Sequence, residues 1–185
     1  YLGLNLTVLI EGYYRGAGSM VSVLGGCVCD TIEVGLADPA FPHSILYSAK
    51  GTMNINGIGN FVFTGAGLNE YYYIVVKHRN ALEIWSSDSV SFYLQNISYD
   101  FTNASGKAFG SNQLSVGGGK YAMHSGDVNQ DGVVNMADVA LTESSMQSFL
   151  TGYYPADLTG DNIVEAADYS ILENKATGGI VVIKP

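Results

Sequence analysis

Two segments near the C-terminal end of the chain carry oxygen-bearing side chains at regular spacing. They are DVNQDGVVNMAD, residues Asp127–Asp138, and DLTGDNIVEAAD, residues Asp157–Asp168, and they start thirty residues apart. A tight loop that binds calcium supplies its ligands from positions 1, 3, 5, 7, 9 and 12, the seventh through its main-chain carbonyl. Calcium is a hard cation that takes roughly six to eight oxygen ligands, and acidic side chains at alternate loop positions provide them. The spacing therefore predicts two calcium ions, one in each loop.

The two loops place similar donors at the same positions. In the first loop the predicted ligands are Asp127, Asn129, Asp131, Val133 through its carbonyl, Asn135 and Asp138. In the second loop they are Asp157, Thr159, Asp161, Ile163 through its carbonyl, Glu165 and Asp168. The alternative is a pair of Asp- and Asn-rich turns without metal, and the matching phase of the two segments argues against it.

Positions 6 and 8 of each loop fit the same pattern. Position 6 requires a residue that tolerates a positive φ, and it is Gly132 in the first loop and Asn162 in the second. Position 8 is Val134 and Val164, where paired loops of the EF-hand type make an apolar contact. The two valines therefore predict an apolar contact between paired loops.

Each loop runs into a segment with helical periodicity. We predict helices over Ala137–Leu150 and Ala166–Ala176. In the first helix Val139, Met146 and Leu150 form the apolar stripe that faces the core.

Acidic charge is concentrated where these loops lie. The whole chain has a formal net charge of −9, and residues 126–185 contain nine acids and two lysines, a net charge of −7. The chain has no basic stripe that could neutralise phosphates, so nucleic acid is excluded as a partner. No run approaches the roughly 20 apolar residues of a membrane span, and no signal peptide opens the chain. Because the sequence begins at Tyr1, we expect a mature or excised form.

The first part of the chain has the pattern of a β-sandwich. Short apolar and β-branched runs alternate with Gly, Asn, Asp and Pro, and helical periodicity is absent. The predicted strands are Leu4–Tyr14, Met20–Leu24, Asp30–Ala37, Ser44–Lys50, Gly51–Ile55, Asn60–Thr64, Tyr71–His78 and Val90–Gln95. In the first of them Leu4, Leu6, Val8 and Ile10 occupy one face. A Gly-rich passage, Ser111–Gly126, is predicted as a linker, since its GGGK lacks the spacing of a phosphate-binding loop.

The fold class expected from these patterns is mainly β with a small α part. The stretch Gly59–Ser86, in which a Gly-bounded strand precedes an aromatic strand, resembles the transthyretin-like or carboxypeptidase-regulatory-like Ig-type sandwiches of bacterial surface proteins. We therefore expect an Ig-like β-sandwich domain over residues 1–121, and a second, calcium-binding domain over residues 122–185.

The C-terminal part resembles a dockerin, of the kind that ends many bacterial extracellular enzymes and surface proteins. Position 12 is Asp where EF-hands usually carry Glu, and no helix precedes the first loop, which points to dockerins over calmodulin-like proteins. The resemblance implies two bound calcium ions and a cohesin-like partner that contacts loop positions 10 and 11. Those positions are Met136, Ala137, Ala166 and Ala167. Dockerins often carry Ser or Thr there, so the apolar residues weigh against the usual contacts.

The sequence contains no recognisable catalytic constellation, and we expect no enzyme activity. His43, His78 and His124 are scattered and have no ligand at zinc-site spacing. His78, Arg79 and Trp85 are interpreted as a strand-end cluster packed with Trp85, with a recognition patch as the alternative. The tyrosines Tyr71–Tyr73 are expected to alternate between core and surface, although they could stack on sugar rings.

Two further features leave alternatives open. Cys27 and Cys29 are the only cysteines, and a disulfide between residues two apart on a strand is strained, so we interpret them as buried free thiols. Sequons for N-glycosylation occur at Asn5, Asn96 and Asn103, and such triplets are common by chance.

Three functions are compatible with the sequence, all of them non-enzymatic and extracellular. The first is a calcium-stabilised structural protein of the bacterial cell surface. It would form a fibre or pilus-like homopolymer in which the apolar N-terminal strand inserts into a neighbouring sandwich as a donor strand. The second is a dockerin-type anchoring module that binds a cohesin-like partner. The third is a carbohydrate-binding module. In each case calcium is expected to fold the C-terminal part, so a chelator should lower its melting temperature.

Overall fold

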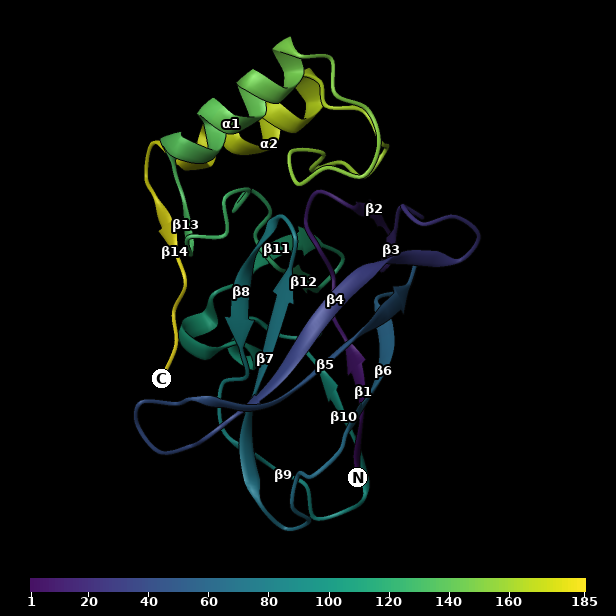
Figure 1. Ribbon diagram of the computed structural model, residues 1–185, viewed down its shortest axis with the longest axis vertical. Helices are drawn as coiled ribbons and strands as arrows, with labels where there is room; N and C mark the ends of the chain where they lie inside the picture. Colours follow the sequence, from purple (N-terminus) through teal and green to yellow (C-terminus); the bar gives the residue numbers. More distant parts are fainter.

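The computed structural model describes residues 1–185, apart from the side chain of Asn174. Its fold is mainly β, as the sequence predicts, with helices confined to the C-terminal part. Two sheets pack face to face, and helices α1 and α2 lie side by side at one end of them, opposite the N-terminus (Figure 1). The first sheet consists of β10 (Asn96–Asp100), β1 (Leu2–Thr7) and β6 (Ile58–Phe63). The second consists of β5 (Ile45–Asn54), β4 (Val28–Ala37), β7 (Tyr71–His78) and β8 (Ala81–Trp85), with β9 (Val90–Ser91) beside β7.

Strand β1 is the central strand of its sheet. It pairs antiparallel with β6 along one edge and parallel with β10 along the other. Leu2, Leu4 and Leu6 point into the sandwich and are at most 1% exposed, because alternate residues of a strand share a face. Both hydrogen-bonding edges of β1 are thus used within the chain. The fibre hypothesis requires β1 to leave its own sheet and insert into a neighbour. That movement would break the hydrogen bonds to both β6 and β10.

The predicted first strand, Leu4–Tyr14, is too long. The strand ends at Thr7, and the main-chain N–H of Val8 donates to the carbonyl of Gly57 at 3.0 Å. Val8, Leu9 and Ile10 are then all fully buried, because the chain leaves the sheet and runs through the interior. The alternation that the prediction extrapolated therefore stops after Leu6.

Other strand predictions were correct in place but not always in length. The strands predicted at Asp30–Ala37 and Tyr71–His78 correspond to β4 and β7, and Asn60–Thr64 overlaps β6. The strands predicted at Ser44–Lys50 and Gly51–Ile55 are one continuous strand, β5, because Gly51 pairs with Ile32 of β4 without a break in register. In place of the strands predicted at Met20–Leu24 and Val90–Gln95 only short pairs form, β3 (Ser19–Met20, paired with β2, Tyr14–Gly16) and β9. The separate strands β8 and β10 were not predicted.

The passage predicted as a linker, Ser111–Gly126, is ordered structure packed on the sandwich. It contains the hairpin of β11 (Leu114–Gly117) and β12 (Lys120–Ala122), which turns through glycines with positive φ. Ala122 and Met123 are fully buried, and Met123 exchanges main-chain hydrogen bonds with the Leu9–Glu11 segment. The linker prediction is wrong, since Gly-rich composition here marks a tight hairpin turn. Two short 3-10 turns precede it, at Ser105–Lys107 and Phe109–Ser111.

The C-terminal part is built on α1 (Met136–Gln147) and α2 (Ala166–Ala176). Helix α1 begins one residue before the predicted Ala137–Leu150 and ends three residues short of it, whereas α2 has the predicted bounds. Two short strands, β13 (Val133–Val134) and β14 (Ile180–Val181), pair with each other. The apolar core of this part consists of Leu82, Val134, Val139, Leu158, Leu172 and Ala176. Leu82 belongs to β8, so the sandwich contributes a side chain to the helical core. Among the described residues, no helix is long and apolar enough to cross a membrane.

The packing of β1 predicts that it is essential for stability. Leu6→Ala removes a fully buried side chain and should cost about 2–5 kcal/mol of unfolding free energy. Val62→Ala, on the solvent face of the neighbouring strand β6, where Val62 is 56% exposed, should change it by less than about 0.5 kcal/mol. Urea unfolding of the two variants measures both values. A negligible loss in Leu6→Ala would show that β1 is not seated as described.

Candidate calcium-binding loops

The first loop is shaped by its own side-chain oxygens, which accept main-chain N–H groups. Asp127 accepts from Asp131 at 3.1 Å through Oδ1 and from Gly132 at 3.2 Å through Oδ2. Asp131 in turn accepts from Val133 at 2.9 Å. Short Asp and Asn side chains fold the backbone in this way because they reach an N–H two to five residues ahead. The loop is thereby wrapped around the carboxylate at its first position.

Position 12 closes the loop and starts the helix. Asp138 Oδ1 accepts from the N–H groups of Val128 and Asn129, at 2.8 and 3.1 Å. Its other oxygen, Oδ2, accepts from Asn135 at 2.9 Å, and the Asn135 side chain caps the N–H of Ala137 at 2.7 Å. This reciprocal cap satisfies N–H groups that have no partner within α1. One carboxylate therefore joins the two ends of the loop to the first turn of α1.

The second loop repeats this arrangement thirty residues later. Asp157 accepts from Gly160 and Asp161 through Oδ1 and from Asn162 through Oδ2, at 2.7, 3.2 and 3.0 Å. At its end Asp168 accepts from Leu158, Thr159 and Glu165, at 2.7, 2.8 and 2.9 Å. The carboxylates at positions 1 and 12 accept from equivalent N–H groups in the two loops, and the bond from Gly160 is additional in the second.

Position 6 has the backbone conformation that the sequence predicts. Gly132 has a φ of 84° and Asn162 a φ of 68°. Asn is one of the few residues other than Gly that adopt this region readily. Both loops therefore make their sharp turn at the predicted residue.

Burial of the carboxylates shows that a cation suits these loops. Asp127 is 3% exposed, and Asp138, Asp157 and Asp168 are fully buried. Burial, followed by the nearby charges of Asp138 and Asp131, raises the pKa of Asp127 to about 6 against the lowering effect of its hydrogen bonds. Burial also raises the pKa of Asp157 and of Asp168. Desolvated carboxylates gathered in one loop are costly unless a positive charge compensates them.

The donor set of each loop is chemically suited to calcium. Both predicted sets combine carboxylate oxygens with a main-chain carbonyl, and the first adds side-chain amide oxygens and the second a hydroxyl. Hard divalent cations take such all-oxygen sets. Among the described side chains, no group of three or more His, Cys, Asp or Glu forms a ready metal cluster. In the first loop half of the predicted ligand positions are not acidic, whereas in the second four of six are.

The loops do not pair with each other as predicted from Val134 and Val164. The first loop pairs through β13 with β14, near the C-terminus. The second pairs with the segment after α1, where Val164 N–H donates to the carbonyl of Leu150 at 3.0 Å. Both valines are nonetheless buried, at 0% and 3% exposure. Each loop is thus held by a different partner segment, which the sequence repeat did not reveal.

The cluster predicted around His78, Arg79 and Trp85 is not one cluster. His78 and Arg79 both contact Asp30 of β4, at 3.0 and 3.1 Å, whereas Trp85 donates to Glu83 and packs near Tyr73. Burial alone would raise the pKa of Asp30, but hydrogen bonds from His78 and Tyr153 hold it well below the usual range. The Arg79 guanidinium also lies near Asp157 of the second loop. The sequence did not predict this contact, because the two residues are far apart in the chain.

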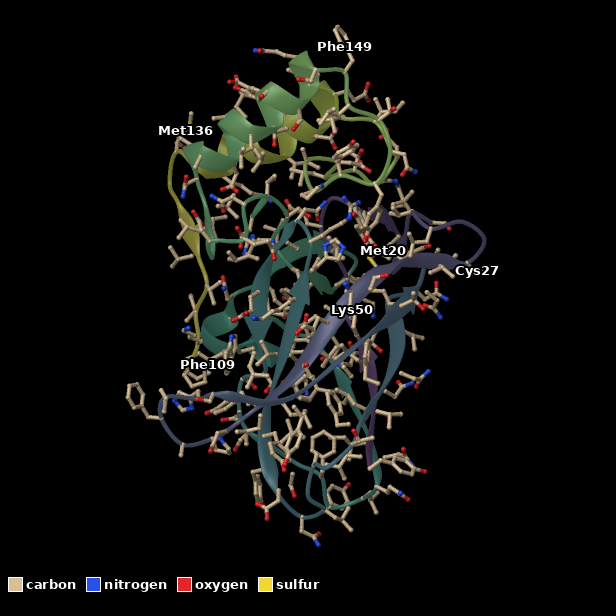
Figure 2. The ribbon with its side chains drawn as sticks, viewed as in Figure 1. Met20, Cys27, Lys50, Phe109, Met136 and Phe149 are labelled. Atoms are coloured by element: carbon tan, nitrogen blue, oxygen red, sulfur yellow. The ribbon has the colours of Figure 1, made fainter. Side chains whose placement is uncertain are left out.

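Other candidate residues lie apart from the loops. Tyr72 is buried while Tyr71 is 56% exposed, which confirms the predicted alternation between core and surface. Cys29 is buried but Cys27 is exposed, at the edge of the sandwich (Figure 2), so the interpretation of two buried thiols is half wrong. Burial raises the pKa of the Cys29 thiol to about 12.

Comparison with known proteins agrees with this geometry. Residues 125–177 match the family model described as Dockerin type I domain, a range that includes both loops, all of α1 and all of α2. Dockerin type I domains bind calcium through EF-hand-like loops, and dockerin modules are non-catalytic and occur on extracellular cellulosome components. No curated protein matches the chain.

Two solved structures share the overall fold. They are crystal structures of type II cohesin–X-dockerin complexes from Acetivibrio cellulolyticus, one with a mutated C-terminal and one with a mutated N-terminal interface. Each match covers 95% of this chain and 96% of the other, at 14% identity, with TM-scores of 0.55 and 0.56. At this identity the likeness establishes the fold alone. It extends across both the sandwich and the helical part.

Calcium binding should release protons near pH 6. The pKa of Asp127 is raised to about 6 in the metal-free loop, and a carboxylate must lose its proton to coordinate a cation. Titration calorimetry in buffers of different ionisation enthalpy measures the released protons. We expect release at pH 6 that disappears at about pH 8, where Asp127 is already ionised. Calcium affinity should accordingly fall as the pH is lowered from 7 to 5, and a pH-independent affinity would contradict the assignment of Asp127.

Proposed function

We propose that this chain is a non-enzymatic, extracellular anchoring module that folds around one calcium ion in each loop and docks onto a cohesin-like protein. The observation that carries the proposal is the dockerin match across the two loops and their helices. In this account residues 1–121 form the supporting sandwich and residues 122–185 the docking domain.

The two ions would be held by the residues predicted from the sequence. The first set is Asp127, Asn129, Asp131, the carbonyl of Val133, Asn135 and Asp138. The second is Asp157, Thr159, Asp161, the carbonyl of Ile163, Glu165 and Asp168. Bound calcium would supply the positive charge that the buried carboxylates lack. The protein's own contribution is to fix the loop backbone and the start of each helix.

The exposed face of α1 has the composition of a docking surface. Met136 is 59% and Leu141 45% exposed, and Phe149, just beyond the helix, is 87% exposed. Met136 and Phe149 lie at opposite ends of α1 (Figure 2). Large apolar side chains in contact with water are candidates for contact with another protein. We propose that the exposed surface of α1, from Met136 to Phe149, contacts the partner.

The corresponding face of α2 is smaller and more polar. Its exposed residues include Ala166, Ala167, Ser170 and Glu173. Loop positions 10 and 11, which the dockerin resemblance assigns to the partner, are exposed in both repeats. Apolar burial contributes more to binding than exposed small or charged residues do. The difference favours α1 over α2 as the main contact.

The likeness to the chains of cohesin–X-dockerin complexes supports the same function. It covers nearly the whole chain, so it concerns the combination of a sandwich with a two-helix calcium part. The competing hypotheses have no comparable support. The strand that a fibre would exchange is the centre of its own sheet, and Tyr72, in the middle of the three tyrosines that could stack on sugars, is only 5% exposed.

The docking surface can be tested with purified cohesins of both types and this full chain. Met136→Lys places a charge in the proposed contact and should weaken binding by at least about tenfold. Val62→Lys is a matched control, because Val62 is 56% exposed on the far-lying strand β6, and it should leave binding unchanged. Titration calorimetry with calcium and with a chelator measures both. Equal weakening by the two variants, or no cohesin binding in calcium, would contradict the proposal.

A further inference from the structure

The second calcium loop is packed directly against the sandwich. A Cβ on Gly160 would lie only 2.7–2.9 Å from atoms of Val21, Val23 and Tyr13, so only Gly fits between the loop and these side chains. On the other side of the contact, a Cβ on Gly12 would lie 2.0 Å from the carbonyl oxygen of Leu158. The main chains of the two parts thus meet at van der Waals distance.

Polar side chains of the sandwich also hold the backbone of this loop. Asn80 Nδ2 donates to the carbonyl of Asp157 at 2.8 Å, and a guanidinium nitrogen of Arg15 donates to the carbonyl of Thr159 at 2.8 Å. These bonds fix loop positions 1 and 3 from outside the loop.

Arg79 reaches the first ligand position of the same loop with a charge. It follows β7, and its guanidinium lies 3.7 Å from Asp157 Oδ2. The same group donates to the carbonyl of Tyr154 and stacks on the Tyr153 ring, 4.1 Å from its centroid. The Arg79 side chain is only 12% exposed, and the Asp157 side chain is fully buried. The ion pair therefore lies where water screens it weakly.

A buried network keeps Arg79 in this position. Its Nε donates to Asp30 Oδ2 at 3.1 Å. Asp30 also accepts from the hydroxyl of Tyr13 at 3.0 Å and from that of Tyr153 at 2.6 Å. Because Asp30 belongs to the sandwich, the position of the guanidinium does not depend on a metal in the loop.

The first loop has a different environment. It is held by β14 and by the N–H of Val182, which donates to the carbonyl of Gly132 at 2.9 Å. Among the ion pairs of the described residues, none involves Asp127, the counterpart of Asp157. The two loops thus have similar internal hydrogen bonds. They differ in that a cationic side chain, Arg79, faces the carboxylate at position 1 of the second loop.

We propose that Arg79 is a built-in counter-cation that keeps the second loop ordered without calcium, while the first loop depends on calcium for its order. This inference rests on the proposed binding of calcium in both loops. It adds that the two loops differ in how ordered they are without calcium. Arg79 attracts Asp157 in the metal-free chain and repels calcium in the loaded one. It therefore stabilises the metal-free second loop more than the loaded loop.

Hydrogen exchange of the full chain, followed by mass spectrometry, tests whether the second loop is more ordered than the first without calcium. The reporters are the amides bonded to the position 1 carboxylates, at Asp131 and Gly132 in the first loop and at Gly160–Asn162 in the second. In calcium both sets should exchange slowly. In chelator the second set should exchange at least about tenfold more slowly than the first, because local opening of an ordered loop is rarer.

Variants at the two arginines separate charge from packing. Arg79→Gln removes the charge and should bring the second loop in chelator to within about threefold of the first loop's exchange rate. Arg79→Lys keeps the charge and should preserve most of the protection. Arg15→Gln is the matched control, since it removes a contact to the same loop that involves no carboxylate, and it should leave the tenfold difference in place. Exchange in the first loop of each variant reports any general loosening of the fold.

The outcomes distinguish this inference from the function it rests on. Equal exchange of the two loops in chelator, or equal effects of Arg79→Gln and Arg15→Gln, overturns the role of Arg79. Exchange in Arg79→Lys as fast as in Arg79→Gln overturns it too, since the charge would then not be the cause. Absence of calcium protection in the first loop of the unmodified chain refutes calcium binding itself, since that loop is the one that depends on calcium for its order.

Discussion

The feature on which the rest of this structure depends is the burial of a carboxylate at the first and last position of each loop. These four side chains accept the main-chain N–H groups that would otherwise have no partner, and they set the point at which α1 and α2 begin. The same burial makes them unfavourable as bare anions. Under the proposed function a bound cation would resolve this conflict, so the fold of the C-terminal part and its proposed affinity for calcium would have one cause.

Calcium loops and sandwich form a continuous body in this chain. Leu82 of β8 enters the helical core, the backbone of the second loop lies against Gly12, and β14 returns along the first loop toward the sandwich. The C-terminal segment then packs Val182 beside Trp85 and Phe109. Helix α1 is thereby held in a fixed orientation relative to the sandwich, which would lower the entropic cost of the proposed docking to a partner.

The parts of the structure that the sequence predicted are those determined by local chemistry. Loop positions, the sharp turns at Gly132 and Asn162, and the span of α2 follow from residues within a few positions of each other. The predictions failed where distant segments meet. Gly51 was predicted to start a new strand because its pairing with Ile32 of β4 is not visible locally, and the Gly-rich hairpin after Ser111 resembles a linker until Met123 is seen to be buried. The contact of Arg79 with the second loop was missed for the same reason, since Asp157 is 78 positions away.

The central claim is that each loop binds a calcium ion through buried carboxylates, and counting the ions tests it most directly. Calcium titration calorimetry of the chelator-treated full chain at pH 7.5 gives the number of ions per chain. The account predicts one ion per loop in the unmodified chain, and the loss of one ion, with the other retained, in each of Asp127→Ala and Asp157→Ala. No calcium uptake, or full uptake in both variants, would contradict it.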